Sequence, residues 1–221
     1  MKKFILTCIV AILNICSIMP ALALENLNFK AGYISDNADL LMENDYSAVT
    51  SIIKELQEKT SAEIAVVTLN SLDNQKVEDV AVEIGRKFKV GAKDKNNGVV
   101  VLVAPNEKTA RIEVGIGLEN VISNQKAQTI MDDDMVPYFA KGYYSSGIYR
   151  GVASIANVIA TSQNVELSST SGMPAQEKND KKIPFWAWPI ILIASLLGVG
   201  KKGNFGGGGG FSGGKGATGR W

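Results

Sequence analysis

The clearest hydrophobic pattern in the chain lies between residues 93 and 117. Val99 to Ala104 is an unbroken apolar run, rich in β-branched residues and too short for a buried helix, so it predicts a central strand. A Pro-Asn pair with the chemistry of a turn follows it. Residues 111–114 then alternate polar and apolar side chains, as a half-buried strand does. We therefore expect a β-hairpin here, with the rest of the folded part covering it or lying at its ends.

Helical and strand patterns on both sides of this hairpin predict an α/β domain. Apolar residues recur at helical spacing in four segments, 44–59, 77–89, 124–135 and 147–162. The sequence EIAVVTL at residues 63–69 predicts a further strand. The resulting order, β-α-β-α-β-β-α-α, predicts a three-layer α/β/α sandwich on a mostly parallel sheet. We expect this domain to occupy residues 32–162.

The first 23 residues have the pattern of a secretory signal peptide. A basic start is followed by an apolar stretch over residues 4–19 and by Ala21-Leu22-Ala23, a small-x-small cleavage motif. We expect cleavage after Ala23. An uncleaved anchor is the alternative, and Pro20 together with the Ala-x-Ala pattern favours cleavage. The folded domain should then lie outside the cytoplasm.

A second apolar segment, IPFWAWPIILIASLLGVG, covers residues 183–200 and has two lysines on each side. A stretch of about 18 apolar residues is at the short end for crossing a bilayer. Trp186, Trp188 and the flanking lysines match the interfacial anchors of a transmembrane helix. We expect one C-terminal transmembrane helix here, which makes the protein a single-pass protein of the cell (inner) membrane with its domain on the extracytoplasmic, periplasmic side.

The segments on either side of the expected span have no periodic apolar pattern. Residues 163–182 are rich in Ser, Lys and Glu and predict a flexible tether. Residues 201–221 form a glycine-rich, basic tail of low complexity, which we expect to lie in the cytoplasm and to bury no core. Its positive charge would suit contact with an anionic membrane leaflet, and a flexible segment without a specific role is the simpler interpretation.

Composition excludes several classes of site. Lys and Arg number 23 against 22 Asp and Glu, so the chain has no overall charge that would favour nucleic acid, and we expect no nucleic-acid partner. There is no histidine, and both cysteines, Cys8 and Cys16, lie in the expected signal peptide. Disulfides, zinc-thiolate sites and Ser-His-Asp or Cys-His pairs are therefore excluded in the mature chain. Any catalysis would depend on carboxylates, hydroxyls, Lys, Arg or a hard metal ion.

Acidic and amide side chains at the ends of the expected strands are the main candidates for a site. These are Asp36, Asp94, Asn97, Glu119 and the run Asp132-Asp133-Asp134. Loops at the carboxyl edge of an α/β sheet gather around ligands, and converging oxygen atoms would suit Ca²⁺ or Mg²⁺. Successive helical residues point about 100° apart, so no more than two of the three aspartates can face one site. A solvated acidic face explains the run equally well.

Two other features have simpler explanations. Gly115-Ile116-Gly117 lacks the third glycine of a dinucleotide loop and follows a hairpin strand, so we interpret it as a turn. Arg111 and Glu113 share one face of the second hairpin strand. A polar pair on an edge strand usually faces water, and an ion pair is the alternative.

Several segments together resemble the TPM-domain family. They are ISDNADLL, EIAVVTL, KDKNNGVVVLVAP, RIEVGIGLE and MVPYFAKGYYSSGI, in this order between Gly32 and Ala160. The ending GATGRW is similar to that of the family's bacterial membrane-anchored members. The resemblance implies an α/β/α sandwich with Ca²⁺ or another divalent ion in an acidic pocket, and an acid phosphatase activity has been proposed for plant members.

Carried over by position, the resemblance implies four metal ligands: Asp36, Asn97, Glu119 and Asp133. Asn96 and Asn97 remove charge that other members have at this turn. We expect a divalent-metal-binding assembly or interaction module of the cell envelope, anchored through residues 183–200, with an envelope protein as a further partner. The alternative is a metal-dependent (acid) phosphatase that uses Asp36, Glu119 and Asp133 as oxygen ligands.

Overall fold

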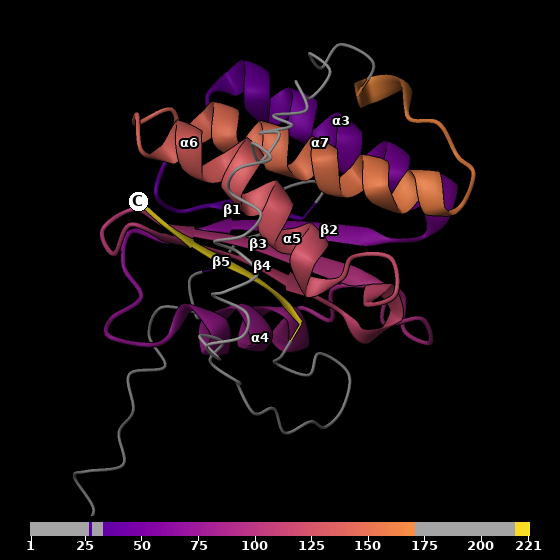
Figure 1. Cartoon of the computed structure of the whole chain (residues 1–221), viewed down its shortest axis with the longest axis horizontal. Coiled ribbons are helices and arrows are strands. Elements are labelled where there is room, and N and C mark those ends of the chain that lie inside the picture. Colours follow the sequence, from indigo (N-terminus) through magenta and orange to yellow (C-terminus); the bar gives the residue numbers. More distant parts are fainter. Residues whose placement is uncertain (1–26, 28–32, 171–214) are drawn as a thin grey trace, which may run out of the picture.

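The computed structural model describes residue 27, residues 33–170 and residues 215–221. They form an α/β fold in which helices cover both faces of a five-stranded sheet (Figure 1). The strands lie side by side in chain order: β1 (Ile34–Asp36), β2 (Glu63–Thr68), β3 (Gly98–Ala104), β4 (Thr109–Val114) and β5 (Gly216–Arg220). The predicted signal peptide and the predicted span over residues 183–200 lie outside the described residues. Within the described part, no helix has the length and apolar character that a membrane crossing requires.

The sheet is mixed, so the prediction of a mostly parallel sheet is only half right. β1, β2 and β3 are parallel neighbours. β4 runs antiparallel to β3 as the second arm of the predicted hairpin, and β5 runs antiparallel to β4. The amino ends of β1 to β3 therefore share one edge of the sheet with the end of β4, and we call this the amino edge. The opposite side, where β1 to β3 end, is the carboxyl edge.

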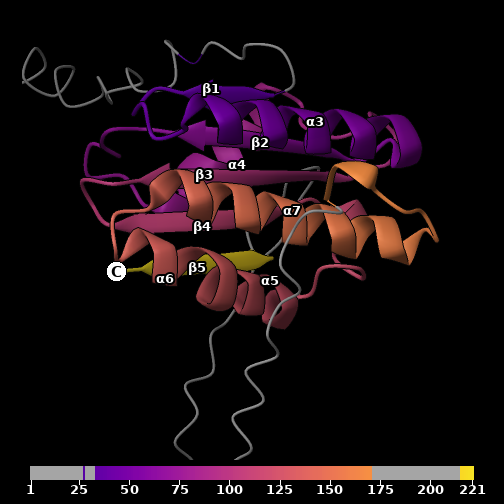
Figure 2. The same cartoon turned by 90° about the horizontal axis from the view of Figure 1, so that it is seen from above.

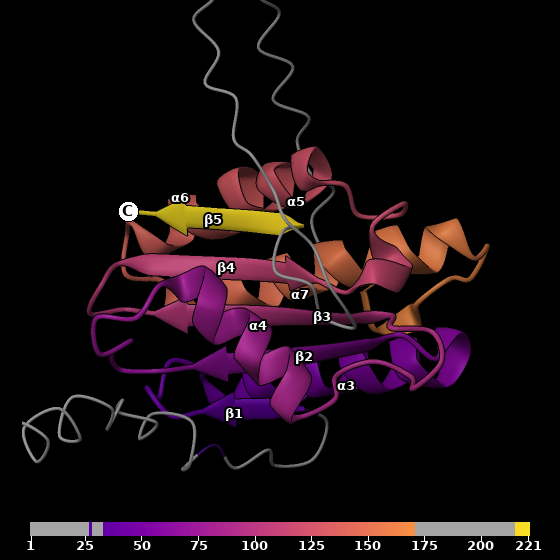
Figure 3. The same ribbon diagram turned by 90° about the horizontal axis from the view of Figure 1, so that it is seen from below.

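Among the described residues, four α-helices pack on one face of the sheet and one packs on the other (Figures 2 and 3). The first group is α3 (Glu43–Thr60), α5 (Asn124–Ile130), α6 (Val136–Phe139) and α7 (Tyr144–Ser162). α4 (Val77–Lys87) packs on the opposite face. The single helix predicted over residues 124–135 is interrupted, because a π-helical turn, Met131–Met135, separates α5 from α6. Ser123 caps α5 by accepting a hydrogen bond from the Lys126 N–H.

The two apolar cores explain why the central strand has no polar positions. Val99, Val101 and Val103 of β3 pack with the helices of one face, while Val100 and Leu102 pack with α4 on the other. All residues of β3 are buried. A strand covered on both faces reads as a continuous hydrophobic run, which confirms the prediction of a central strand.

The two crossover connections have opposite hands. β1, β2 and β3 follow one another across the sheet in the same direction. α3 joins β1 to β2 over one face, whereas α4 joins β2 to β3 over the other (Figures 2 and 3). Each crossover moves the chain to the next strand in the same direction, but the two pass over opposite faces of the sheet, so they have opposite hands. One of them is therefore left-handed, although nearly all such connections in proteins are right-handed.

The C-terminal residues contribute to the domain, which corrects the prediction that the glycine-rich tail buries no core. β5 pairs along the outer edge of β4, from Thr109 opposite Arg220 to Glu113 opposite Gly216. Ala217 is only 2% exposed and belongs to the core shared by α3, α5 and α7. The last strand of the sheet therefore comes from a segment far along the chain from β4 (yellow in Figure 1).

Arg111 and Glu113 form a buried ion pair rather than a solvated polar face. The Arg111 guanidinium donates to Glu113 Oε2 from Nε (3.0 Å) and Nη2 (2.6 Å), and the Glu113 side chain is fully buried. α4 packs over this face of β4 and β5 pairs along its outer edge, so β4 is not the edge strand that the sequence suggested. The pair also contacts β5, because Arg111 Nη1 donates to Thr218 Oγ1 (3.2 Å).

Replacing Arg111 should destabilise the fold strongly. Arg111→Met leaves the buried Glu113 carboxylate without its guanidinium, and breaking a buried pair from one side costs about 3–5 kcal/mol of unfolding free energy. Urea denaturation of Arg111→Met and of Arg220→Met, an exposed arginine in β5, measures the difference. Arg220→Met should change stability by no more than about 0.5 kcal/mol. Equal effects of the two substitutions would contradict the structural role of the pair.

Candidate functional site

The candidate site lies where the connections after β1 and β2 leave the sheet in opposite directions. Residues 37–42 lead from β1 to α3 on one face, and residues 69–76 lead from β2 to α4 on the other. Diverging connections at the carboxyl edge leave a crevice, the usual place of ligands in open α/β sheets. Asp36 and Thr68 end the two strands and lie opposite each other at this point.

A pocket of about 410 Å³ opens beside the end of β1, on the α3 side of this crevice, and we call it the switch-point pocket. Its lining residues come from β1, the following loop and the first turn of α3: Ile34, Asp36, Asn37, Asp39, Leu41, Glu43 and Tyr46. Three of these are carboxylates, so the pocket is acidic and suits a positively charged group.

Asp36 holds the loop that forms the rim of this pocket. Its Oδ1 accepts a hydrogen bond from the Leu40 N–H (3.0 Å) and its Oδ2 accepts one from the Leu41 N–H (2.9 Å). Thr68 Oγ1 donates to Asp36 Oδ1 and accepts from the Ala38 N–H (2.9 Å). The carboxylate already accepts three hydrogen bonds, which makes it first of all the support of residues 37–42.

Ser145 of α7 fixes the other side of the same loop. Its hydroxyl accepts from the Met42 N–H (2.9 Å) and donates to Asp45 Oδ2 (2.5 Å). A Ser–Asp pair could suggest a nucleophile and a base. Here the serine is only 3% exposed and its oxygen is bound by a backbone N–H, so the pair is a clamp between α3, α7 and the loop.

A second hollow of about 420 Å³ lies on the α7 side of this loop. Residues 39–42 form one wall, and residues 142–146 form the other. Two large apolar side chains here are strongly exposed, Met42 at 70% and Tyr143 at 60%. Asp39 lines both hollows, so an acidic pocket and an apolar surface share one rim.

The structure does not bring the four predicted metal ligands together. Asp36 lies at the carboxyl edge, whereas Asn97 directly precedes β3 and Glu119 follows β4, which places both at the amino edge. The expected convergence of these oxygen atoms at the carboxyl edge is therefore wrong for Asn97 and Glu119, because Asn97 comes before β3 and β4 returns to the same edge. Within the described residues, no three Asp, Glu, His or Cys side chains are grouped so that they could hold a metal ion.

At the amino edge, Asn97 and Glu119 have structural partners. Asn97 is 5% exposed, and its Oδ1 accepts from the Ala92 N–H (2.9 Å), which closes the turn before β3. Glu119 forms an ion pair with Lys215 (3.3 Å) at the start of β5. Both side chains therefore serve to hold the local structure.

The fourth predicted ligand, Asp133, is exposed on the π-helical turn. Its neighbour Asp134 is the buried aspartate of the run. Asp134 Oδ2 accepts from Ser154 Oγ (2.7 Å), and its Oδ1 lies 3.6 Å from Arg150 Nη2. A π-turn changes the angular step between residues, so helical periodicity could not identify which aspartate faces inward.

Comparison with known families agrees with these features. The family model described as the TPM domain matches residues 34–158, which is more than half of the chain. The chain belongs to the TPM-domain family. This confirms the resemblance found in the sequence, and the matched range ends before β5.

Two solved structures illustrate the likeness of this TPM domain. The N-terminal domain of a protein from P. gingivalis, determined by NMR in solution, is 27% identical with a TM-score of 0.57, and the alignment covers 62% of this chain and 87% of that one. The BA42 protein from the psychrophilic bacterium Bizionia argentinensis is 24% identical with a TM-score of 0.49, covering 60% and 94%. A comparison with curated proteins finds no match.

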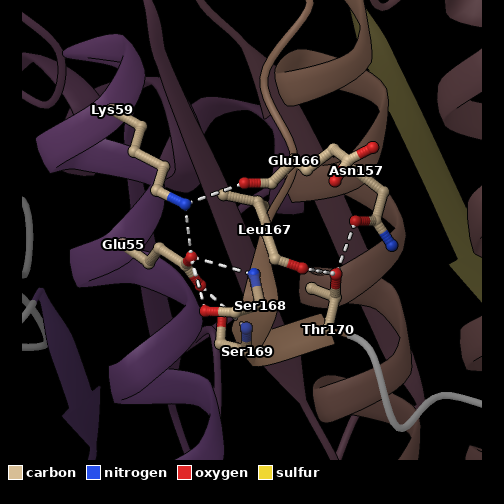
Figure 4. Close-up of polar contacts among 8 residues, drawn as sticks. All are labelled: Glu55, Lys59, Asn157, Glu166, Leu167, Ser168, Ser169 and Thr170. Atoms are coloured by element: carbon tan, nitrogen blue, oxygen red, sulfur yellow. Dashed lines mark hydrogen bonds and ion pairs between the residues drawn. The ribbon is translucent and has the colours of Figure 1, made fainter.

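A polar clasp holds the last described turn of the TPM domain against α3 (Figure 4). Glu55 Oε1 accepts from Lys59 Nζ, Ser168 N–H and Ser168 Oγ, each at 2.8 Å. Glu55 Oε2 accepts from the Ser169 N–H, also at 2.8 Å. The Lys59 ammonium, followed by the hydrogen bonds from the serines, holds the pKa of the Glu55 carboxyl well below its usual range. The clasp fixes Ser168 and Ser169 against α3.

Removing the charge of Asp36 should loosen the rim of the switch-point pocket. In Asp36→Asn, the amide nitrogen faces backbone N–H groups that need an acceptor, which costs about 1–3 kcal/mol of unfolding free energy. Hydrogen exchange at the amides of Leu40 and Leu41 should accelerate. Asp39→Asn removes the same charge from an exposed position of the same loop and is the matched control. The assignment fails if both variants lose stability equally.

The Glu55 clasp should weaken in acid. Because the folded-state pKa lies below the unfolded value, Glu55 contributes stability above a pH of about 4.3, and this contribution is lost as pH falls through the folded-state pKa. Glu55→Gln should therefore be less stable than wild type at pH 7, with a difference that shrinks below pH 4. Urea denaturation at several pH values measures this. Glu58→Gln, an exposed position of the same helix, controls for loss of charge, and a pH-independent difference for Glu55→Gln would contradict the role of the carboxylate.

Proposed function

We propose that this TPM-domain protein is an interaction module of the cell envelope rather than an enzyme, with the switch-point pocket as its ligand site. The observation that carries the proposal is the acidic pocket formed by the end of β1, the loop after it and the first turn of α3. Its polar groups suit binding more than catalysis, because Asp36 supports the loop and the nearby Ser145–Asp45 pair is a buried clamp.

The ligand that fits these surroundings best is a basic side chain of an envelope protein. Asp36, Asp39 and Glu43 supply negative charge, and the last two are exposed. The exposed Met42 and Tyr143 lie across the same rim. Methionine, aromatic residues and arginine are enriched in protein interfaces, and a guanidinium next to an aromatic ring and a carboxylate gains from both.

Direct coordination of Ca²⁺ or Mg²⁺ by the predicted set of four residues does not fit, since they lie at two edges of the sheet. Such ions require several oxygen ligands around one point. Ion binding by the pocket carboxylates alone would raise the melting temperature when a divalent metal ion is added. No mechanism for phosphate hydrolysis follows from the placement of these residues.

Location outside the cytoplasm is part of the same proposal. The N-terminal segment has the features of a secretory signal, and residues 183–200 have the composition of a membrane-seated segment. The domain would then act at the periplasmic surface of the inner membrane, where an envelope protein could reach the pocket.

A basic peptide should bind the pocket in a salt-dependent manner. Titration of the purified protein with tetra-arginine should shift the NMR resonances of residues 37–42 and 142–146, and raising the salt concentration should weaken the binding because exposed charges are screened. Asp39→Asn/Glu43→Gln should abolish the shifts, whereas Glu58→Gln should leave them unchanged.

The same protein tests the metal and phosphatase alternatives. Addition of CaCl₂, MgCl₂ or MnCl₂ should leave the melting temperature unchanged, and p-nitrophenyl phosphate should not be hydrolysed. A bound ion at 100 times its Kd would raise the unfolding free energy by about 2.7 kcal/mol. Such a rise, together with metal-dependent hydrolysis lost in Asp36→Asn, would replace the interaction module by the phosphatase.

A further inference from the structure

The C-terminal residues Gly216–Trp221 lie along β4 like a bound peptide. Backbone contacts continue beyond the paired strands at both ends: the Val114 N–H donates to the Lys215 carbonyl (3.1 Å), and the Trp221 N–H donates to the Lys108 carbonyl (3.3 Å). All residues of β4 are buried. Without β5, this buried strand would present an open edge. Addition of a strand to such an edge is a general mode of peptide recognition.

Two positions of the segment accept only glycine. Gly216 has a φ of +151°, and a Cβ there would lie 2.0 Å from the Ile112 carbonyl oxygen. A Cβ on Gly219 would lie 2.6 Å from Met131 and Val136 side-chain atoms. The groove therefore discriminates against any larger side chain at these two places.

The residues between and after the glycines are also recognised. Ala217 enters the core, and Thr218 Oγ1 donates to Glu78 Oε1 (2.8 Å) on α4 while it accepts from Arg111. The Trp221 ring lies 4.8 Å from the Phe139 ring and 5.9 Å from the Tyr144 ring, between centroids. Such aromatic pairs add about 0.5–1.5 kcal/mol beyond area burial.

The start of the segment is held by two polar contacts. The Gly216 N–H donates to Asn124 Oδ1 (3.0 Å) at the beginning of α5, and Lys215 pairs with Glu119. The groove thus makes specific contacts with the segment Gly-Ala-Thr-Gly-Arg-Trp: with its small residues, its threonine hydroxyl, its tryptophan ring and the backbone at both of its ends. Arg220 alone is exposed.

We propose that the groove along β4 is a sequence-specific peptide-binding site whose ligand is the chain's own C-terminal segment, Gly216–Trp221, and that this segment and the TPM domain lie on the same side of the membrane. Residues 183–200 precede the segment, so a single crossing there would separate it from its groove. The tail expected in the cytoplasm would instead remain with the domain. The assignment of that side as extracytoplasmic rests on the proposed function.

Cysteine cross-linking in intact cells tests whether segment and groove meet. Thr109 and Arg220 lie opposite each other in β4 and β5. Full-length Thr109→Cys/Arg220→Cys, with Cys8 and Cys16 replaced by Ala, should form an intramolecular disulfide on treatment with the membrane-permeant oxidant copper-phenanthroline. Thr109→Cys/Lys215→Cys places the second thiol at the far end of β5 and should not react. Absence of the Thr109–Arg220 cross-link would overturn the proposal, and a covalent dimer would overturn the assignment to one chain.

The proposed location is tested separately with single cysteines at Arg220 and at Glu58. A membrane-impermeant maleimide should label both from outside the inner membrane. If Glu58→Cys is labelled before lysis and Arg220→Cys reacts only after lysis, the domain and the C-terminal segment lie on different sides of the membrane. This result would overturn the inference that they share one side. If neither is labelled before lysis but the disulfide still forms, the extracytoplasmic location fails while the groove and its ligand stand.

Peptide competition tests the sequence specificity of the groove. Full-length Gly219→Val should release its own segment, since valine clashes with Met131 and Val136. A fluorescein-labelled GATGRW peptide should bind this variant and not wild type, in fluorescence anisotropy, and a GATVRW peptide should bind neither. Equal binding of the two peptides would overturn the specificity. If Gly219→Val does not fold by circular dichroism, Trp221→Ala serves as the second variant.

Discussion

Complete burial of β3 and β4 is the constraint on which the rest of this structure depends. Every residue of β3 is buried, so both faces of the sheet must be covered and both neighbouring positions must be filled. β2 fills one position and β4 the other. Because β4 is itself buried throughout, with the Arg111–Glu113 pair on one face, it needs a further strand on its outer edge. The C-terminal segment supplies that strand from the other end of a long connection.

The sequence predicts the parts of this fold that have strong apolar periodicity. The predicted helices over 44–59, 77–89 and 147–162 correspond to α3, α4 and α7, and the hairpin has the expected turn. β5 could not be recognised, because Gly-Ala-Thr-Gly-Arg has neither alternation nor β-branched residues beyond one threonine. Its strand conformation is imposed by the groove, where glycine is required by close contact rather than by flexibility. The left-handed crossover likewise has no sequence pattern of its own.

The predicted candidate site residues lie at two edges of the sheet rather than at one. Asp36 lies at the switch point, as a strand-end aspartate should. Asn97 and Glu119 also lie at strand ends, but the direction of each strand decides which edge its ends reach, and no local pattern encodes that direction. Glu119 illustrates the consequence: a carboxylate chosen as a metal ligand serves to hold Lys215, next to the first residue of β5. Motif residues of a family can therefore support its architecture as well as its chemistry.

The candidate ligand site and the described residues on either side of residues 171–214 lie at opposite edges of the sheet. The described residues stop just after the Glu55 clasp, near the end of α3 that leads into β2, and resume at Lys215, beside Val114. Both points lie at the amino edge (Figure 3). The switch-point pocket lies at the opposite, carboxyl edge. If, as proposed, residues 183–200 lie in a membrane, the described residues on both sides of them, at the Glu55 clasp and at Lys215, lie at the edge of the sheet opposite the acidic pocket.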